Sequence, residues 1–310
     1  MRPMTALTAL FAVLLSASTA LANGPAPKRE KRSREHKVER DGVRLALYER
    51  WAPSEEKNWK GNGRVVLLIH GGTWSSRCTF DPVPQASLMD ALADEGFDVW
   101  AVDLHNFGAS AKSDRDWSEA SSTVGDVDAA VDYIRAFRWV EKVHVFGFQW
   151  GAQVAGLFAA QKPNKVGRLA LFGMRYQQHD SGKQAPQYPS RKNSLSTASL
   201  KPDDGDLEPE LARRRADVCA RLDPDSPNGA VLDSQRASPV EPQDLTVPTL
   251  VLQGERDGGP DTMRDRLDFF SRLSPPHRAF VVLPELGKWA LLERNRYRLT
   301  RALVDFFDMP

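Results

Sequence analysis

The sequence predicts an α/β fold, a mostly parallel, doubly wound sheet led by an antiparallel hairpin. Short, continuous apolar runs rich in β-branched residues alternate along the chain with longer segments of helical spacing. The apolar runs lie at residues 65–69, 99–102, 143–146, 169–172, 250–252 and 280–283. Continuous runs of this kind are typical of strands buried on both faces of a parallel sheet. We therefore expect helices to cover both faces.

The helical segments carry apolar residues at three- and four-residue intervals. They cover residues 86–95, 124–137, 153–161, 262–273 and 289–307. Before the first apolar run, residues 38–49 alternate around Asp41-Gly42, a dipeptide that favours hairpin turns. The folded domain is thus predicted to extend over residues 38–310 and to begin with two antiparallel edge strands.

Residues 1–22 are typical of a signal peptide. Arg2 supplies the positive end, residues 6–15 are apolar, and Ala20-Leu21-Ala22 matches the A-x-A cleavage pattern. We expect cleavage after Ala22 and a secreted or periplasmic protein, with a retained membrane anchor as the alternative. The apolar run is shorter than the roughly 20 residues that a membrane span requires, so no transmembrane span is predicted.

Two further segments stand apart from the alternating pattern. Residues 23–37 are basic and contain proline, and we expect them to form a flexible leader. Residues 175–244 are rich in Ser, Pro, Asp and Gln and contain one predicted helix at 208–222. This stretch is far longer than the roughly two to six residues that usually connect a helix and a strand. It predicts a cap or lid insertion, with a disordered loop as the alternative.

Composition excludes several classes of function. The chain has 42 Lys and Arg against 41 Asp and Glu, a net charge of +1, so it lacks the basic excess typical of nucleic-acid binding. The spacings typical of metal sites and the glycine-rich phosphate loop are absent from the sequence, and we predict no metal and no cofactor. The sequence leaves the oligomeric state undetermined.

Short motifs follow the predicted strands in a fixed order. They are His70-Gly71-Gly72-Thr73-Trp74, Asp103-x-x-x-Phe107-Gly108-x-Ser110, Gly147-Phe148-Gln149-Trp150-Gly151, Gly254-Glu255-Arg256-Asp257 and Gly287-Lys288-Trp289. In this order, from residue 38 to the end, the chain resembles the α/β-hydrolase fold superfamily of serine hydrolases, esterases and lipases. The resemblance implies a nucleophile on a strained turn, an acid after a later strand and a histidine base after the last strand.

At two of these positions the chain departs from the family. The nucleophile position holds Gln149, whose carboxamide is a poor nucleophile and loses no proton near neutral pH. The base position holds Lys288, a cation at pH 7 without a lone pair for a proton. Asp257 alone matches its role, that of the triad acid. The resemblance therefore implies a degenerate triad.

The same resemblance assigns the rest of the site. An oxyanion hole is implied from the backbone N–H of Trp150 and of Thr73 or Gly72. Trp74, Phe148, Trp150 and Trp289 map to the rim, which implies a pocket for an apolar or acyl ligand. Cys78 follows the oxyanion loop and Cys219 lies in the predicted cap helix. A disulfide that staples the cap and two separate thiols are equally compatible with the sequence.

Chemistry suggests how the three altered positions fit together. We expect the Lys288 ammonium to pair with Asp257 and to donate to the carbonyl oxygen of Gln149, so that no buried polar group is left unsatisfied. The alternative is that Gln149 simply packs in a strained turn.

The predicted function is that of a secreted, non-catalytic pseudohydrolase that binds a small apolar ligand or a partner. One alternative is an active hydrolase of carboxylic esters, lipids or amides that uses non-standard residues. Candidates for those residues are Ser75, Ser76, Ser110, His105, His179 and His277. The other alternative is a non-hydrolytic enzyme that uses Lys288 and Asp257 in acid–base chemistry. Whether the protein is an enzyme thus stays open at this point.

Overall fold

The computed structural model describes residues 29–59, 63–113, 115–178, 184–195, 200, 205–274 and 277–310. The predicted signal peptide, the first part of the predicted leader and His179 lie outside the described residues.

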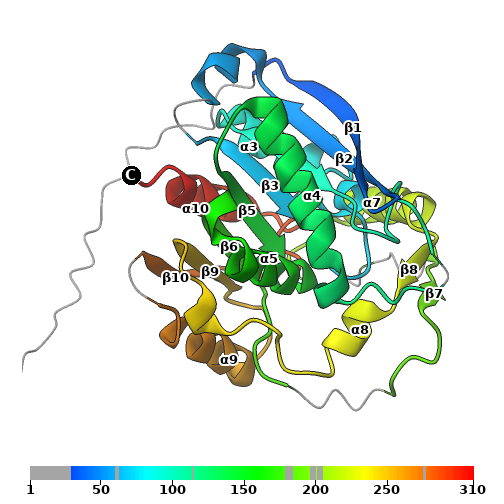
Figure 1. Cartoon of the computed structure of the whole chain (residues 1–310). Coiled ribbons are helices and arrows are strands. Elements are labelled where there is room, and N and C mark those ends of the chain that lie inside the picture. Colours follow the sequence, from blue (N-terminus) through cyan, green and yellow to red (C-terminus); the bar gives the residue numbers. More distant parts are fainter. Residues whose placement is uncertain are drawn as a thin grey trace, which may run out of the picture.

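A mixed β-sheet runs through the centre of the described chain (Figure 1). It has eight strands in the order β1-β2-β4-β3-β5-β6-β9-β10. The strands are β1 (Arg32–Arg40), β2 (Val43–Trp51), β3 (Val65–Ile69), β4 (Asp98–Val102), β5 (Val143–Phe148), β6 (Val166–Phe172), β9 (Thr249–Gly254) and β10 (Arg278–Leu283). β1 pairs antiparallel with β2 and β2 antiparallel with β4, and the remaining neighbours are parallel. The predicted fold class, a mostly parallel sheet led by an antiparallel hairpin, is confirmed.

Helices cover both faces of this sheet. α4 (Ala120–Arg138), α5 (Trp150–Gln161) and α9 (Pro260–Ser271) pack on one face, and α3 (Leu88–Asp94) and α10 (Tyr297–Phe307) on the other. Short 3₁₀ helices that begin with proline lie at Pro53–Asn58, Pro84–Ala86, Pro163–Lys165 and Pro242–Asp244. Within the described residues, none of the helices combines the length and the apolar character needed to cross a membrane.

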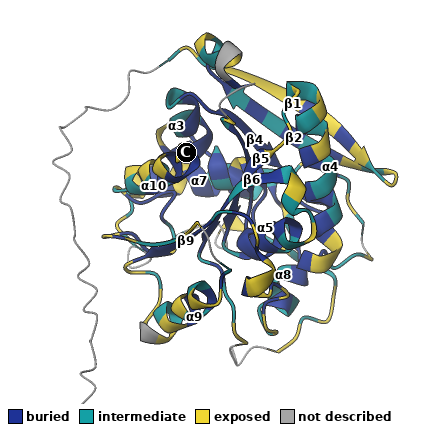
Figure 2. Cartoon of the chain, turned by 60° about the vertical axis from the view of Figure 1, so that its left-hand side comes forward, coloured by how far each residue is buried: buried dark blue, intermediate teal, exposed yellow. Residues whose placement is uncertain are grey.

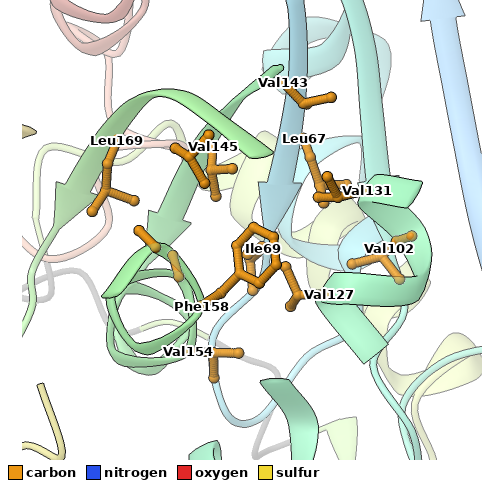
Figure 3. Packing of buried hydrophobic residues seen from close by; sticks show 14 of the residues in the cluster. Leu67, Ile69, Val102, Val127, Val131, Val143, Val145, Val154, Phe158 and Leu169 are labelled. Carbon is orange, nitrogen blue, oxygen red and sulfur yellow. The ribbon is translucent and has the colours of Figure 1, made fainter. Parts of the chain in front are cut away.

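The core on the α4 and α5 face shows why the continuous apolar runs form strands. Phe158 of α5 and Val127 of α4 face Leu67 and Ile69 of β3, with side chains interleaved (Figure 3). The residues of β3, β4 and β5 are all buried, since helices cover the sheet on both sides (Figure 2). Burial on both faces removes the need for polar residues at every second position.

The first strand begins earlier than expected. β1 starts at Arg32, so the prediction of a flexible leader does not hold for residues 32–37. His36 and Val38 are buried, and the His36 ring lies 4.7 Å from that of Trp100 and 5.1 Å from that of Phe137. An edge strand exposes its alternate side chains. The charged residues between the buried ones made this strand look like a solvated tail.

The last predicted helix is shorter than expected. α10 covers only Tyr297–Phe307, whereas residues 289–296 form turns interrupted at Glu293 by an isolated antiparallel bridge to Leu207. The amides of Leu292 and Glu293 both donate to the carbonyl of Trp289. Ala290, Leu291 and Leu292 are buried one after another, a pattern that a helix with one buried stripe does not allow.

The segment between β6 and β9 forms an insertion rather than a plain loop. It contains β7 (Ser190–Lys192), α7 (Pro209–Leu222), β8 (Asp225–Pro227) and α8 (Gly229–Asp233), and β7 pairs antiparallel with β8. A short helix that the sequence did not predict, α2 (Ser76–Phe80), packs against α7. Cys78 of α2 and Cys219 of α7 form a disulfide with their Cα atoms 5.2 Å apart. The alternative left open by the sequence is thereby decided.

His144 gives the fold a predicted sensitivity to acid. Its ring stacks on Phe307, with centroids 4.9 Å apart, and burial, assisted by the positive charge of Arg168, lowers its pKa to about 4. The unfolded chain, with a histidine pKa near 6.5, takes up the proton first as the pH falls. The free energy of unfolding should therefore fall between pH 6.5 and 4, by about 3 kcal/mol in total, and level off below that range.

Urea denaturation of the wild type and of His144→Leu between pH 7 and pH 4 measures this contribution. The variant should show a shallower loss of stability over that window. Parallel pH profiles for the two proteins would contradict the assignment to His144.

Candidate functional site

The turn between β5 and α5 places Gln149 at the centre of the predicted site. Gln149 has φ 53° and ψ −118°, a conformation that side-chain-bearing residues rarely adopt. A Cβ on Gly151 would overlap the carbonyl of His70, and a Cβ on Gly147 would lie only 2.5 Å from the Cα of Ala152. Gly151 is therefore required by the close approach of α5 to the end of β3, and Gly147 by the close approach of β5 to α5. The strained elbow implied by the motif is present.

The strain at Gln149 leads to a prediction about stability. Glycine adopts positive φ without a Cβ clash, whereas alanine keeps the clash. Gln149→Gly should therefore have a free energy of unfolding about 1 to 2 kcal/mol higher than Gln149→Ala, since both variants lose the same carboxamide contacts. Chemical denaturation of the two variants side by side measures the difference. Equal stabilities would show that the turn carries no strain.

The carboxamide of Gln149 bridges two loops. Its Nε2 donates to the backbone carbonyl of Lys288 at 3.1 Å, in the loop after β10. Its Oε1 lies 3.5 Å from the position that a Cβ on Gly71 would take, in the loop after β3. The side chain thus spans the site from the predicted oxyanion loop to the predicted base loop.

Asp257 approaches the same place from the end of β9. An ideal Cβ on Gly173 would lie 3.6 Å from Gln149 Cγ and 3.7 Å from Asp257 Oδ2, so both side chains border one point. Burial raises the pKa of Asp257, while the positive charges of Arg266 and Lys288 act in the opposite direction. Arg266 pairs with the carboxylate at 3.3 Å. Gln149, Lys288 and Asp257 are therefore brought together.

The structure shows two contacts that the expected network did not include. The side-chain amide of Gln149 donates to the main-chain carbonyl of Lys288. The arginine that pairs with Asp257 comes from α9, a helix to which the sequence analysis gave no role. The Lys288 ammonium lies 5.4 Å from the ring centroid of Trp289.

A small pocket of about 70 Å³ opens beside Gln149. Predicted site residues in its wall are Gly72, Thr73, Trp74, Phe148, Gln149 and Trp289, and unpredicted ones are Gly71, Cys78, Thr79, Arg215, Leu291 and Leu292. The wall is mostly apolar. The volume is well below the roughly 300–1,000 Å³ of typical small-molecule sites.

Trp150 does not line this pocket, which corrects its predicted place at the rim. Its indole N–H donates to Asp233 of α8 at 2.7 Å, and its ring packs against Phe107. As the first residue of α5, Trp150 still has a backbone N–H without an intrahelical acceptor. Only its main chain remains a candidate for the oxyanion hole.

The insertion holds the loop after β3 in place. Arg191 donates to the carbonyl of Gly72 at 3.2 Å and to Thr73 Oγ1 at 3.0 Å, and Ser226 donates to the carbonyl of Thr73. Asp223 accepts hydrogen bonds from both the amide and the hydroxyl of Ser75, at 2.9 and 2.8 Å. The predicted oxyanion loop thus depends on the cap for its conformation.

The hydroxyl groups considered as substitute nucleophiles have structural partners. Ser75 donates to Asp223, Ser76 to Asp103, and Ser110 to the carbonyl of Asp103. None of these three serines is among the described residues that line the pocket.

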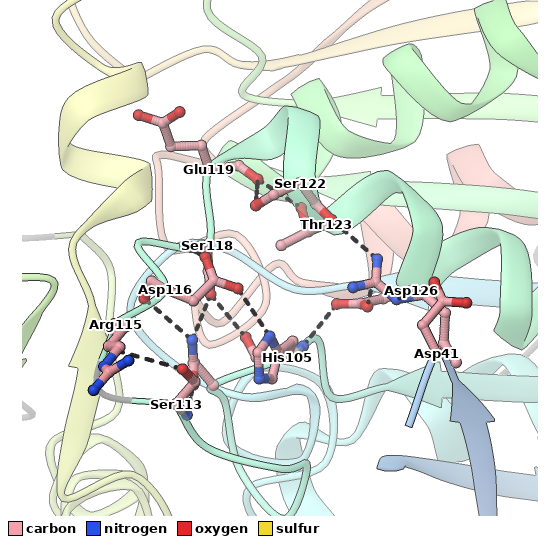
Figure 4. Close-up of polar contacts among 12 residues, drawn as sticks. Asp41, His105, Ser113, Arg115, Asp116, Ser118, Glu119, Ser122, Thr123 and Asp126 are labelled. Atoms are coloured by element: carbon pink, nitrogen blue, oxygen red, sulfur yellow. Dashed lines mark hydrogen bonds and ion pairs between the residues drawn. The ribbon is translucent and has the colours of Figure 1, made fainter. Parts of the chain in front are cut away.

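The histidines considered as bases also lie elsewhere. His105 pairs with Asp116 at 3.0 Å, and its amide donates to Asp126 at 2.8 Å (Figure 4). His277 is exposed in the turn before β10, with φ 77°. The described residues also contain no group of three or more His, Cys, Asp or Glu suited to hold a metal ion.

Arg215 is the site residue that sequence reasoning missed. It lies on α7, lines the pocket and is only 3% exposed. A signal was present, because Arg215 precedes Cys219 by one helical turn and so shares its face of the predicted cap helix. Had the disulfide been assumed, Arg215 would have been placed beside the oxyanion loop.

Comparisons with known proteins agree with this architecture. A family model described as the α/β hydrolase fold matches residues 64–214. Epoxide hydrolase 3 of Siraitia grosvenorii is 28% identical over 125 residues, which are 37% of this chain and 34% of that protein. The match therefore spans about a third of the relative's length.

Solved structures match over most of the chain. A meta-cleavage product hydrolase from Pseudomonas fluorescens superposes with a TM-score of 0.62 at 19% identity, covering 88% of this chain and 97% of that one. A thermophilic esterase from Thermogutta terrifontis gives a TM-score of 0.60 at 19% identity, with coverage of 88% and 97%. At this level of identity the likeness establishes the fold.

Proposed function

We propose that this chain, which has the α/β-hydrolase fold, is a secreted pseudohydrolase that binds a small apolar or acyl ligand without turning it over. The observation that carries the proposal is the position of Gln149. It occupies the strained turn after β5, and its side-chain amide donates to the main-chain carbonyl of Lys288. A neutral carboxamide held in this way supplies neither an attacking oxygen nor a proton to remove.

The surroundings of the pocket support this proposal. The hydroxyl-bearing residues in its described wall are Thr73 and Thr79. Thr73 Oγ1 accepts a hydrogen bond from Arg191, and Thr79 Oγ1 donates to the carbonyl of Trp74 at 3.2 Å. Neither of these partners, a guanidinium and a main-chain carbonyl, is a base of the kind that activates a hydroxyl nucleophile. Binding therefore explains the pocket better than acyl transfer.

The proposed ligand follows from the wall of the pocket. Trp74, Phe148, Trp289 and Leu291 present apolar surface, and the volume of about 70 Å³ suits a short acyl group. A longer ligand requires the Gln149 side chain to leave its bridge to Lys288.

The proposed location outside the cytoplasm has two supports. The N-terminal sequence carries the features of a signal peptide, with an A-x-A pattern ending at Ala22. The disulfide between Cys78 and Cys219 is of a kind that persists in oxidising compartments.

Hydrolysis of p-nitrophenyl esters with acyl chains from acetyl to palmitoyl tests the proposal. The mature wild-type protein should show no turnover above the buffer rate. Turnover that survives Gln149→Ala and disappears in Asp257→Ala would overturn it and favour an active hydrolase with non-standard residues. Asp244 is exposed and is not part of the pocket wall, so Asp244→Ala serves as the control for the quality of each protein preparation.

A further inference from the structure

A main-chain carbonyl fixes the orientation of the Gln149 carboxamide. The Lys288 carbonyl oxygen only accepts hydrogen bonds, so the carboxamide atom that faces it at 3.1 Å is the nitrogen Nε2. The carboxamide oxygen, Oε1, is therefore turned away from Lys288. Among the described residues, none donates a hydrogen bond to this oxygen. Gln149 thus presents an acceptor that the described part of the chain leaves open.

The missing side chain of Gly71 leaves space beside this oxygen. Gly71 and Gln149 both belong to the wall of the small pocket. A Cβ on Gly71 would lie 3.5 Å from Oε1 and 3.6 Å from the carbonyl oxygen of Phe148, so a longer side chain at residue 71 would stand against Oε1. Because Gly71 has no side chain, Oε1 stays accessible on the side of the loop after β3.

The same loop carries an open donor. Arg191 donates to the carbonyl of Gly72, and a trans peptide group places the following N–H, that of Thr73, on the opposite side. The insertion therefore turns the Thr73 N–H away from Arg191. Among the described residues, none accepts a hydrogen bond from this N–H. Since Thr73 lines the pocket, an open acceptor and an open donor belong to the wall of one pocket.

The remaining wall favours a small, mostly apolar group. Trp74, Phe148 and Leu291 present apolar surface, and the volume of about 70 Å³ holds a group of few heavy atoms. A secondary amide carries an N–H and a C=O on one planar unit and directs them to opposite sides. An ester of the same shape has no N–H, so it would leave Oε1 unpaired and bring a second acceptor against it.

We propose that the pocket binds the short N-acyl group of a secondary amide, with Oε1 of Gln149 accepting the ligand's N–H. The N–H of Thr73 donates to the ligand's carbonyl oxygen, and the acyl methyl lies against the apolar wall. This inference rests on the proposed function, because it names the class of ligand for the same site. It gives Gln149 a role in recognition at the position that the resemblance assigns to the nucleophile.

Titration of the wild-type protein with N-methylacetamide and with methyl acetate, followed by ligand-observed NMR, tests the inference. The two probes have nearly the same shape, but only the amide has an N–H. Fragments of this size bind weakly, so the titration extends to tens of millimolar. N-methylacetamide should bind at least fivefold more tightly than methyl acetate. A preference below fivefold, or no binding of the amide, would overturn the proposal.

A variant assigns the preference to one oxygen. Methionine has nearly the length of glutamine but only a weak acceptor, so Gln149→Met should bind the amide and the ester within twofold of each other. Gln161→Met makes the same change at the exposed end of α5, outside the pocket wall, and should keep the fivefold preference. A folded Gln149→Met that keeps this preference would contradict the proposal. If that variant fails to fold, the comparison of amide with ester on the wild type still decides.

Failure of this inference and failure of the proposed function give different results. Turnover of p-nitrophenyl esters together with a preference for the amide would overturn the non-catalytic proposal and leave the amide site in place. Absence of turnover together with equal binding of amide and ester would overturn the amide site alone.

Discussion

The double variant Gln149→Ser with Lys288→His is expected to hydrolyse p-nitrophenyl acetate at least about 100-fold faster than the wild type, since a positioned general base contributes roughly 10²–10⁴ in rate. The turn at residue 149 already has the positive φ that holds a nucleophile above the sheet. Residue 288 lies beside this turn, as shown by the hydrogen bond of 3.1 Å from the side-chain amide of Gln149 to the Lys288 carbonyl. Asp257 borders the same point and offers the third group.

The single variants separate the contributions to this gain. Gln149→Ser alone supplies an oxygen without a base, and Lys288→His alone supplies a base without a nucleophile, so each should stay near the wild-type rate. Adding Asp257→Ala to the double variant should remove most of the gain, because the acid orients and stabilises the imidazolium. A folded double variant with no turnover would mean that the site has been remodelled beyond its reacting groups.

Removing the disulfide with Cys78→Ser and Cys219→Ser should lower the free energy of unfolding by about 3 to 5 kcal/mol. The two cysteines are 141 residues apart in the sequence, so the bond restricts a long loop of the unfolded chain. Both are fully buried in an apolar cluster between α2 and α7, where burying a serine hydroxyl costs free energy.

Urea denaturation of the oxidised wild type and the double serine variant measures this loss. Cys219→Ser alone, which leaves one thiol, should be nearly as destabilised as the double variant. A loss below about 1 kcal/mol would contradict the expected role of the bond.

The sequence predicted the sheet from local patterns, and it predicted the turn at Gln149 from the order of motifs that resembles the α/β-hydrolase fold. Strands such as β3 and β5 are continuous apolar runs, and their order along the chain prescribes a parallel sheet with helices on both faces. Gly147 and Gly151 mark a place where backbones approach closely, and the structure shows the contacts that exclude a Cβ there.

Other features lay beyond the sequence because they depend on how separate helices, strands and loops meet in the folded chain. The partner of Asp257 is Arg266, which is nine residues away but separated from it by the turn that starts α9. The hydrogen bond from the Gln149 side chain to the Lys288 carbonyl depends on where the turn after β5 meets the loop after β10. Trp150 turns away from the pocket because Asp233 of the insertion accepts its indole N–H.

By itself, then, the sequence determined the fold class, because periodicity is recorded locally. Its resemblance to the α/β-hydrolase fold implied the turn that carries Gln149 and the group of residues around it. Only the tertiary structure decided the disulfide, the early start of β1 and the entry of Arg215 into the pocket. Each of these joins segments more than ten residues apart, as with the 141 residues between Cys78 and Cys219. Such contacts form only when the whole chain has packed, because burial of one surface decides which distant surface meets it.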